Sequence, residues 1–259
     1  MFSFFKKKKR LTQKDEEVVE IQDFTNVEPI AEYFKNETGV TFDNQISILK
    51  NKVMTFCRQR KINSFSKLLA MVDEDAKIKQ ELIDYLTTNE TFFYREFRQI
   101  AELVELVKNN TNNVKILCAP SATGEEPYSI AIALLEAGVL PSRIEIIGID
   151  INSDALNKAR EATYKERNIR NLSDEIKEKY FDKQENLYTL KSSVKSLVTF
   201  KLQNLFDPSF LNLGKFDFIF CRNMFIYFDA PTKTKAKNIL ESMRKNTNQE
   251  IFFGHADQL

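Results

Sequence analysis

The chain has 259 residues, enough for one large domain or for a domain with a smaller companion. Its 38 basic and 37 acidic side chains almost cancel, which excludes a strong overall attraction to nucleic acid or to a membrane surface. Three scattered cysteines indicate a reducing compartment, a single histidine argues against a zinc site or a histidine-dependent triad, and no segment approaches the roughly 20 apolar residues that span a bilayer. We therefore expect a cytoplasmic protein without a metal site and without membrane insertion.

The first part of the chain divides into a tail and a helical segment. Residues 1–25 are charged and aperiodic, and we expect them to be flexible. Apolar residues then recur at spacings of three and four, as in Leu49, Val53 and Phe56. This pattern predicts a small all-helical N-terminal subdomain over residues 26–86.

Strands and helices alternate in the rest of the chain, which we interpret as one domain over residues 87–259. The expected elements are, in order, a helix over 96–109, a strand over 114–118, a helix over 127–137, a strand over 144–149, a helix over 153–162, a polar passage over 163–180, strands over 187–190, 197–202 and 216–221, a helix over 232–244 and a strand over 250–253. We interpret the strands over 187–190 and 197–202 as a β-hairpin, inserted at about 183–203. The alternation predicts an α/β fold with a parallel, doubly wound, Rossmann-like sheet.

The loop after the first strand indicates the class of ligand. A dinucleotide-binding loop needs three glycines so that backbone N–H groups can approach a pyrophosphate, whereas this loop contains only Gly124. Glu125 and Glu126 follow it and would repel a phosphate, although they suit the positive end of the helix dipole. We therefore expect a ligand with hydroxyls or positive charge. S-adenosylmethionine, which has a ribose, an ammonium and a sulfonium, meets that requirement.

Polar side chains also follow the second and the fifth predicted strands. Asp150 closes the second strand, where an acid accepts hydrogen bonds from both ribose hydroxyls of an adenosine. Capping of the next helix is the alternative, and the neighbouring glycine loop favours ribose binding. Arg222 and Asn223 leave the strand over 216–221 at its carboxyl end, and Tyr227 follows them. A structural ion pair of Arg222 and core packing of Tyr227 are the alternatives there.

The segment that joins the two parts carries an amide, a hydroxyl and a guanidinium, in Asn89, Thr91 and Arg95. A helix cap followed by an aromatic staple explains these residues equally well. In the helical part, six basic residues and no acidic one lie between Asp43 and Asp73: Lys50, Lys52, Arg58, Arg60, Lys61 and Lys67. A solvated helix face normally mixes both signs, so this basic stretch indicates an acidic partner, either a nucleic acid or a protein surface.

Together these segments resemble the chemotaxis receptor glutamate methyltransferases, the CheR family. The matching motifs stand in the family's order at Thr88–Glu96, Thr123–Ser129, Gly148–Asp150, Phe220–Phe228 and Gly254–Asp257. The resemblance implies a class I methyltransferase fold with a helical N-terminal subdomain and an inserted β-hairpin. It also implies a cytoplasmic enzyme that moves a methyl group from S-adenosylmethionine to glutamate side chains of chemotaxis receptors, giving glutamyl methyl esters and S-adenosylhomocysteine.

The resemblance further implies residue roles. The cofactor-binding positions are Asn89, Thr91, Arg95, Gly124, Glu125, Asp150, Asn204, Leu205, Arg222 and Asn223. Among these, Asp150 falls on the ribose, and Asn204 and Leu205 lie beside the adenine. Arg95 and Tyr227 match the residues that orient the acceptor carboxylate, and we take them as the catalytic residues.

The expected chemistry suits this set of residues. A glutamate side chain is already ionised at neutral pH, so attack on a methyl group needs no general base. The basic stretch would then recognise the acidic receptor helices, without nucleic acid, and we expect a monomer. The predicted hairpin lacks the glycine-containing loop with which some members grip a receptor's C-terminal pentapeptide. The alternatives are a methyltransferase for another acceptor and a non-catalytic module that binds the cofactor or docks on receptors.

Overall fold

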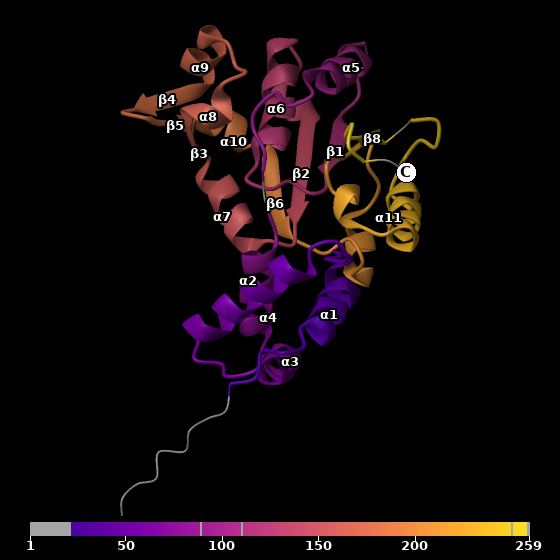
Figure 1. Ribbon diagram of the computed structural model, residues 1–259. Coiled ribbons are helices and arrows are strands. Elements are labelled where there is room, and N and C mark those ends of the chain that lie inside the picture. The colour runs from indigo at the N-terminus through magenta and orange to yellow at the C-terminus, as the bar shows by residue number, and fades with distance from the viewer. Residues whose placement is uncertain (1–21, 89, 110, 250, 258–259) are drawn as a thin grey trace, which may run out of the picture.

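The computed structural model describes residues 22–88, 90–109, 111–249 and 251–257. Most of the predicted tail, and the candidate residue Asn89, lie outside the described residues. In the described part, a group of N-terminal helices packs against one end of a central sheet (Figure 1). None of the described helices is long and apolar enough to cross a membrane.

Four N-terminal helices pack around an apolar cluster of their own. They are α1 (Glu28–Thr38), α2 (Ile46–Gln59), α3 (Phe65–Glu74) and α4 (Ala76–Leu86). Apolar residues at helical spacing, such as Leu49 and Val53, are fully buried in this cluster. Side chains that accept backbone N–H groups define two helix starts, with Ser64 before α3 and Asp75 before α4. The predicted N-terminal helices are therefore confirmed.

The second part is built on a five-stranded parallel sheet with the strand order β6-β2-β1-β7-β8. The strands are β1 (Val114–Cys118), β2 (Ile144–Asp150), β6 (Val198–Leu202), β7 (Phe218–Cys221) and β8 (Phe252–Phe253). From β1, the chain adds β2 and β6 on one side, and then returns to add β7 and β8 on the other side. The strand order therefore reverses between β1 and β7. In such sheets, ligands bind beyond the carboxyl ends of the strands at this reversal point.

Helices cover both faces of this sheet, as expected for a doubly wound fold. The main ones are α5 (Phe97–Lys108), α6 (Glu125–Glu136), α7 (Ser153–Glu161) and α11 (Ala230–Ser242), with short 3-10 turns η1 (Pro141–Arg143), η2 (Pro208–Leu213) and η3 (Phe225–Tyr227). Successive β1 residues face opposite sides. Ile116 and Cys118 lie in the cluster with α5, α6 and α7, and Leu117 lies in the cluster with α11. The α/β fold is confirmed.

The predicted pairing of residues 187–190 with residues 197–202 is wrong, although the insert does contain a β-hairpin, formed by residues 181–184 and 187–190. The insert contains β3 (Thr163–Lys165), α8 (Glu166–Ile169), α9 (Asp174–Tyr180), β4 (Phe181–Gln184), β5 (Leu187–Leu190) and α10 (Ser192–Lys195). In it, β5 pairs antiparallel with β3 and β4 in a separate three-stranded sheet, whereas residues 198–202 form β6, parallel to β2. The reason is non-local burial, since the Phe200 ring of β6 packs 5.4 Å from the Tyr128 ring of α6.

The helical part is attached at the carboxyl edge of the sheet (Figure 1). Just after β2, the Asn152 side-chain amide donates to the Asp84 carbonyl at 3.1 Å and to the Thr87 hydroxyl at 2.7 Å. The Thr41 backbone N–H donates to the Tyr227 carbonyl at 2.9 Å. These contacts hold the N-terminal helices over the strand ends and close one side of the expected ligand crevice.

Candidate active site

A cavity of about 510 Å³ lies at the carboxyl ends of β1, β2 and β7. Its remaining walls come from the loop over 40–45 after α1 and from the segment over 86–95 between α4 and α5. The candidate residues that line it are Thr91, Arg95, Asp150, Asn204, Leu205, Arg222, Asn223 and Tyr227. The structure thus brings together candidate residues from four separate segments of the chain.

Gly124 is explained by backbone conformation and packing. Its φ is +93°, in the left-handed region that favours glycine. A Cβ atom there would lie 3.0 Å from the Ala159 Cβ and 3.1 Å from the rings of Phe200 and Tyr128. Gly124 is not among the residues that line the cavity. The glycine at this position therefore lets α6 begin close to α7 and β6. The close packing fixes the direction of the residues that follow Gly124.

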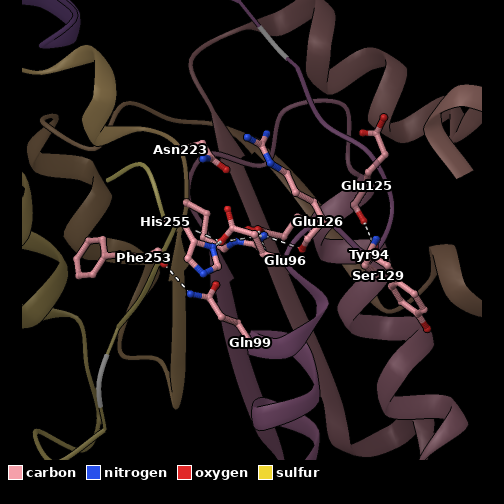
Figure 2. Close-up of polar contacts among 12 residues, drawn as sticks. Tyr94, Glu96, Gln99, Glu125, Glu126, Ser129, Asn223, Phe253 and His255 are labelled. Atoms are coloured by element: carbon pink, nitrogen blue, oxygen red, sulfur yellow. Dashed lines mark hydrogen bonds and ion pairs between the residues drawn. The ribbon is translucent and has the colours of Figure 1, made fainter. Parts of the chain in front are cut away.

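The two glutamates at the start of α6 point in different directions (Figure 2). Glu125 is fully buried away from the cavity, where its carboxylate accepts from the Thr123 hydroxyl at 2.6 Å and from the Asn168 amide at 2.8 Å. Glu126 lines the cavity instead. The prediction that Glu125 lies beside the ligand is therefore not supported by the geometry. Successive helical residues differ by about 100° in direction, so only one of the pair could face the crevice.

Arg222 joins the cavity wall to the segment between α4 and α5. Its Nη1 lies 2.9 Å from the Glu126 Oε2, and its Nη2 donates to the Arg95 carbonyl at 2.6 Å. Glu96 lies 3.6 Å from the same guanidinium and 2.9 Å from the His255 Nδ1 (Figure 2). Burial raises the pKa of Glu126 to about 7, because desolvation outweighs the attraction of the Arg222 charge. The negative charge of Glu96 raises the pKa further.

Asp150 holds the loop after β1 against the end of β2. Its carboxylate accepts from the Ala122 backbone N–H at 2.8 Å and from the Asn152 backbone N–H at 2.9 Å. The residue that caps α7 is Asn152, whose side chain accepts from Ala155, so helix capping does not account for Asp150. Burial raises the pKa of Asp150 to about 6. Its place in the cavity wall leaves it available to hydroxyl donors.

Asn204 and Leu205 are anchored in the fold. The Asn204 amide donates to the Glu37 carbonyl at 2.6 Å, and its oxygen accepts from the Phe206 N–H at 2.9 Å. The Leu205 side chain is buried in the core. Both residues line the cavity, so a ligand there would contact this segment.

Sequence reasoning assigned no role to Asp257, although Gly254–Asp257 matched a family motif. Its buried carboxylate accepts the backbone N–H groups of Asn223, Phe225, Ile226 and Gly254. These bonds hold Asn223 at a φ of +57° and shape the turn that leads to Tyr227. Asp257 is thus the residue that organises the loop after β7.

Arg95 and Tyr227 lie at the mouth of the cavity. The Tyr227 side chain is exposed, and the Arg95 guanidinium donates to the Glu90 carbonyl at 2.9 Å. Neither side chain has an ion pair within the part of the chain that the structure describes. Both are therefore placed to meet a group that enters from solvent.

Three polar atoms in the cavity wall are buried without a hydrogen-bond partner among the described residues: Ser121 Oγ, Glu126 Oε1 and Arg222 Nε. Buried polar groups in folded proteins are almost always paired, so these atoms indicate a polar ligand. A carboxylate oxygen and a guanidinium N–H on one wall suit a zwitterion. The amino-acid end of S-adenosylmethionine is a zwitterion, so the residues present fit the expected cofactor.

Comparison with known proteins places the chain in a family. Residues 89–259 match the family described as CheR methyltransferase, SAM binding domain. The chemotaxis protein methyltransferase of Campylobacter jejuni is 34% identical over 223 residues, which cover 85% of this chain and 83% of that protein. The corresponding protein of Borreliella burgdorferi is 31% identical over 86% of this chain and 84% of its own length. That of Salmonella typhimurium is 31% identical over 84% of this chain and 78% of its own length. The chain therefore belongs to the CheR family of methyltransferases, which bind S-adenosylmethionine.

Proposed function

We propose that this protein transfers a methyl group from S-adenosylmethionine to glutamate carboxylates of chemotaxis receptors, giving glutamyl methyl esters and S-adenosylhomocysteine. The observation that carries the proposal is the division of the cavity into two ends. Buried, unpartnered polar atoms of Glu126 and Arg222 lie inside, whereas Arg95 and Tyr227 lie at the mouth. The relatives named above are chemotaxis protein methyltransferases, which supports receptors as the acceptors.

The inner residues are assigned to the cofactor, which supplies a methyl group on a sulfonium when bound. Glu126 takes the ammonium and Arg222 the carboxylate of its amino-acid end, while Asp150 accepts from the ribose hydroxyls. Asn204 and Leu205 meet the adenine. Asn89, Thr91 and Asn223 retain the cofactor-binding roles that the resemblance implies, and Gly124 and Glu125 act by positioning Glu126.

The mouth residues are assigned to the acceptor. The incoming glutamate is ionised at neutral pH and needs no proton acceptor, so catalysis consists of holding its oxygen in line with the methyl group. Arg95 and Tyr227 orient that carboxylate. Transfer neutralises one positive and one negative charge, so exclusion of water by the loop over 40–45 favours it.

The basic stretch contributes unequally to receptor docking in this proposal. The Arg60 Nε lies 2.7 Å from the Glu81 carboxylate and its guanidinium stacks 3.7 Å from the Phe56 ring centroid, so Arg60 serves the fold. Lys50 donates to the Thr25 carbonyl. Lys52 lines the cavity, and Arg58 and Lys61 are exposed. We assign docking to these last three residues.

The test is methyl transfer from labelled S-adenosylmethionine to membranes that carry receptors encoded in the same genome. We expect base-labile label on the receptors, and loss of label when the receptor glutamates are changed to glutamine. Arg95→Ala and Tyr227→Phe should lower kcat while S-adenosylhomocysteine still binds to the Tyr227 variant. Label that resists base would indicate another acceptor, and tight cofactor binding without transfer would indicate a non-catalytic module.

Docking is tested in the same assay with the charge reversals Arg58→Glu and Lys61→Glu, at exposed residues outside the cavity. Both should raise the KM for receptors without changing cofactor affinity. Lys183→Glu, an exposed lysine of β4, serves as the control. An unchanged KM in the first two variants would contradict the assignment.

A further inference from the structure

Two arginines from different parts of the fold lie over one aromatic ring at the cavity mouth. The Arg170 guanidinium carbon is 3.8 Å from the centroid of the Phe92 ring, and that of Arg95 is 5.7 Å from it. Phe92 and Arg95 line the cavity, whereas Arg170 follows α8 in the insert and is exposed. We call these three residues the Phe92 cluster. It extends from the cavity out to the protein surface.

The position of the Phe92 cluster is fixed by the fold. The backbone N–H of the next residue, Phe93, donates to the Asn168 carbonyl of α8 at 2.8 Å. The fully buried Phe93 ring packs edge-on against Tyr164 at 4.9 Å and against Phe181 at 5.4 Å. The segment before α5 and the insert are therefore held together, and Phe92 and Arg170 meet because of that contact.

Neither arginine of the Phe92 cluster forms an ion pair with a described residue, although the Glu126 carboxylate attracts Arg95 from a greater distance. Arg170 donates to the Arg167 carbonyl at 2.5 Å, and Arg95 donates to the Glu90 carbonyl, so both contacts are with neutral backbone groups. Two guanidinium groups over one ring repel each other unless an anion lies nearby. Stacking on an aromatic face leaves the N–H edges of a guanidinium free and oriented for a carboxylate.

We propose that the Phe92 cluster binds a second acidic side chain of the acceptor protein, one helical turn from the glutamate that is methylated. This inference rests on the proposed function. Arg95 lies on the cavity side and meets the acceptor carboxylate, while Arg170 lies outside and meets its acidic neighbour. On a helix, side chains three or four positions apart lie about 6 Å from each other. The enzyme therefore prefers target glutamates that have an acidic residue one turn away.

The test compares Arg170→Ala and Arg170→Glu with Arg167→Ala, a matched exposed arginine of α8. Because an exposed ion pair contributes up to about 1 kcal/mol, Arg170→Ala should raise the receptor KM about fivefold, and Arg170→Glu should raise it further. The kcat, the affinity for S-adenosylhomocysteine and the Tm should stay unchanged, as they should in Arg167→Ala. Equal KM values for the two alanine variants, or a loss of cofactor affinity in Arg170→Ala, would overturn the inference.

A binding measurement separates this inference from the proposed function. The probes are two fluorescent helical peptides, one with glutamates at positions i and i+4 and the other with glutamine at i+4. The wild-type protein should bind the first peptide more tightly, and Arg170→Glu should lose that preference. If this preference is found but receptors are not methylated, the proposed function fails and the docking role of the Phe92 cluster stands. If receptors are methylated but no preference is found, the inference alone fails.

Discussion

Glu126→Gln tests the electrostatics of the site through stability. Glu126 is packed in the cavity wall and its charged form is disfavoured by burial, which raises its pKa from the ordinary value near 4.5 to about 7. In the unfolded chain the same carboxyl ionises near its ordinary value. Between these two pH values the unfolded state therefore binds fewer protons than the folded state, and rising pH destabilises the fold.

The size of this effect follows from the two pKa values. One pKa unit corresponds to about 1.4 kcal/mol, so a rise from 4.5 to about 7 amounts to about 3 kcal/mol. This contribution of Glu126 to the free energy of unfolding is fully present below pH 4.5 and is lost as the pH rises through 7. The glutamine variant does not titrate. We therefore expect it to become more stable relative to the wild type by about 2–3 kcal/mol between pH 5 and pH 8.

The assay is urea unfolding of both proteins at pH 5 and pH 8 without cofactor, with Glu178→Gln as an exposed control. In parallel, calorimetry should show that Glu126→Gln binds S-adenosylhomocysteine at least tenfold more weakly, because a neutral amide replaces the carboxylate assigned to the ammonium. A glutamine variant that becomes less stable than the wild type as the pH rises would refute the reasoning. It would mean that attraction to Arg222 outweighs the cost of burial.

Three further predictions concern the loop before α6, the loop after β7 and the start of α11. Gly124→Ala should lower the free energy of unfolding by about 1–3 kcal/mol, since its Cβ would lie 3.0 Å from that of Ala159, whereas Gly138→Ala, with no atom within 4 Å, should cost less in the same thermal melts. Asp257→Asn should lower both the Tm and the kcat, because an amide has one acceptor oxygen, whereas both oxygens of the carboxylate accept backbone N–H groups of the loop after β7. A normal kcat would show that the loop keeps its conformation without the carboxylate. The Lys35 contact and the capping bond to Thr232 hold the pKa of Asp229 at about 2. Their contribution to the free energy of unfolding is therefore present above the ordinary pKa of an aspartate and is lost as the pH falls through 2. Lys35→Ala should unfold at a higher pH than the wild type in an acid titration, and identical titrations would exclude a role for the pair.

The order of elements could be predicted from the sequence because periodicity is a local property. Spacings of three and four predict the N-terminal helices, and apolar runs between polar loops predict β1, β2 and β7. The pairing of residues 187–190 and 197–202 could not be predicted in the same way. Both segments are strands, but their partners depend on burial against α6 and on contacts with distant parts of the chain.

Most of the candidate residues predicted from sequence motifs do line the cavity, including Arg95, Asp150, Arg222 and Tyr227. Motifs do not show which way a side chain points. That limit explains the choice of Glu125 over Glu126 and the inclusion of Arg60 among the docking residues, although it pairs with Glu81.

By itself, then, the sequence determined the fold class, the family and the chemical class of the ligand, because these depend on residue types and on spacing along the chain. Only the tertiary structure decided that Glu126 faces the cavity and that Asp257 organises the loop after β7. It also decided that Arg170 and Arg95 share the ring of Phe92. Each of these facts depends on residues that are distant in the chain and that folding brings into contact, and burial then raises the pKa of Glu126.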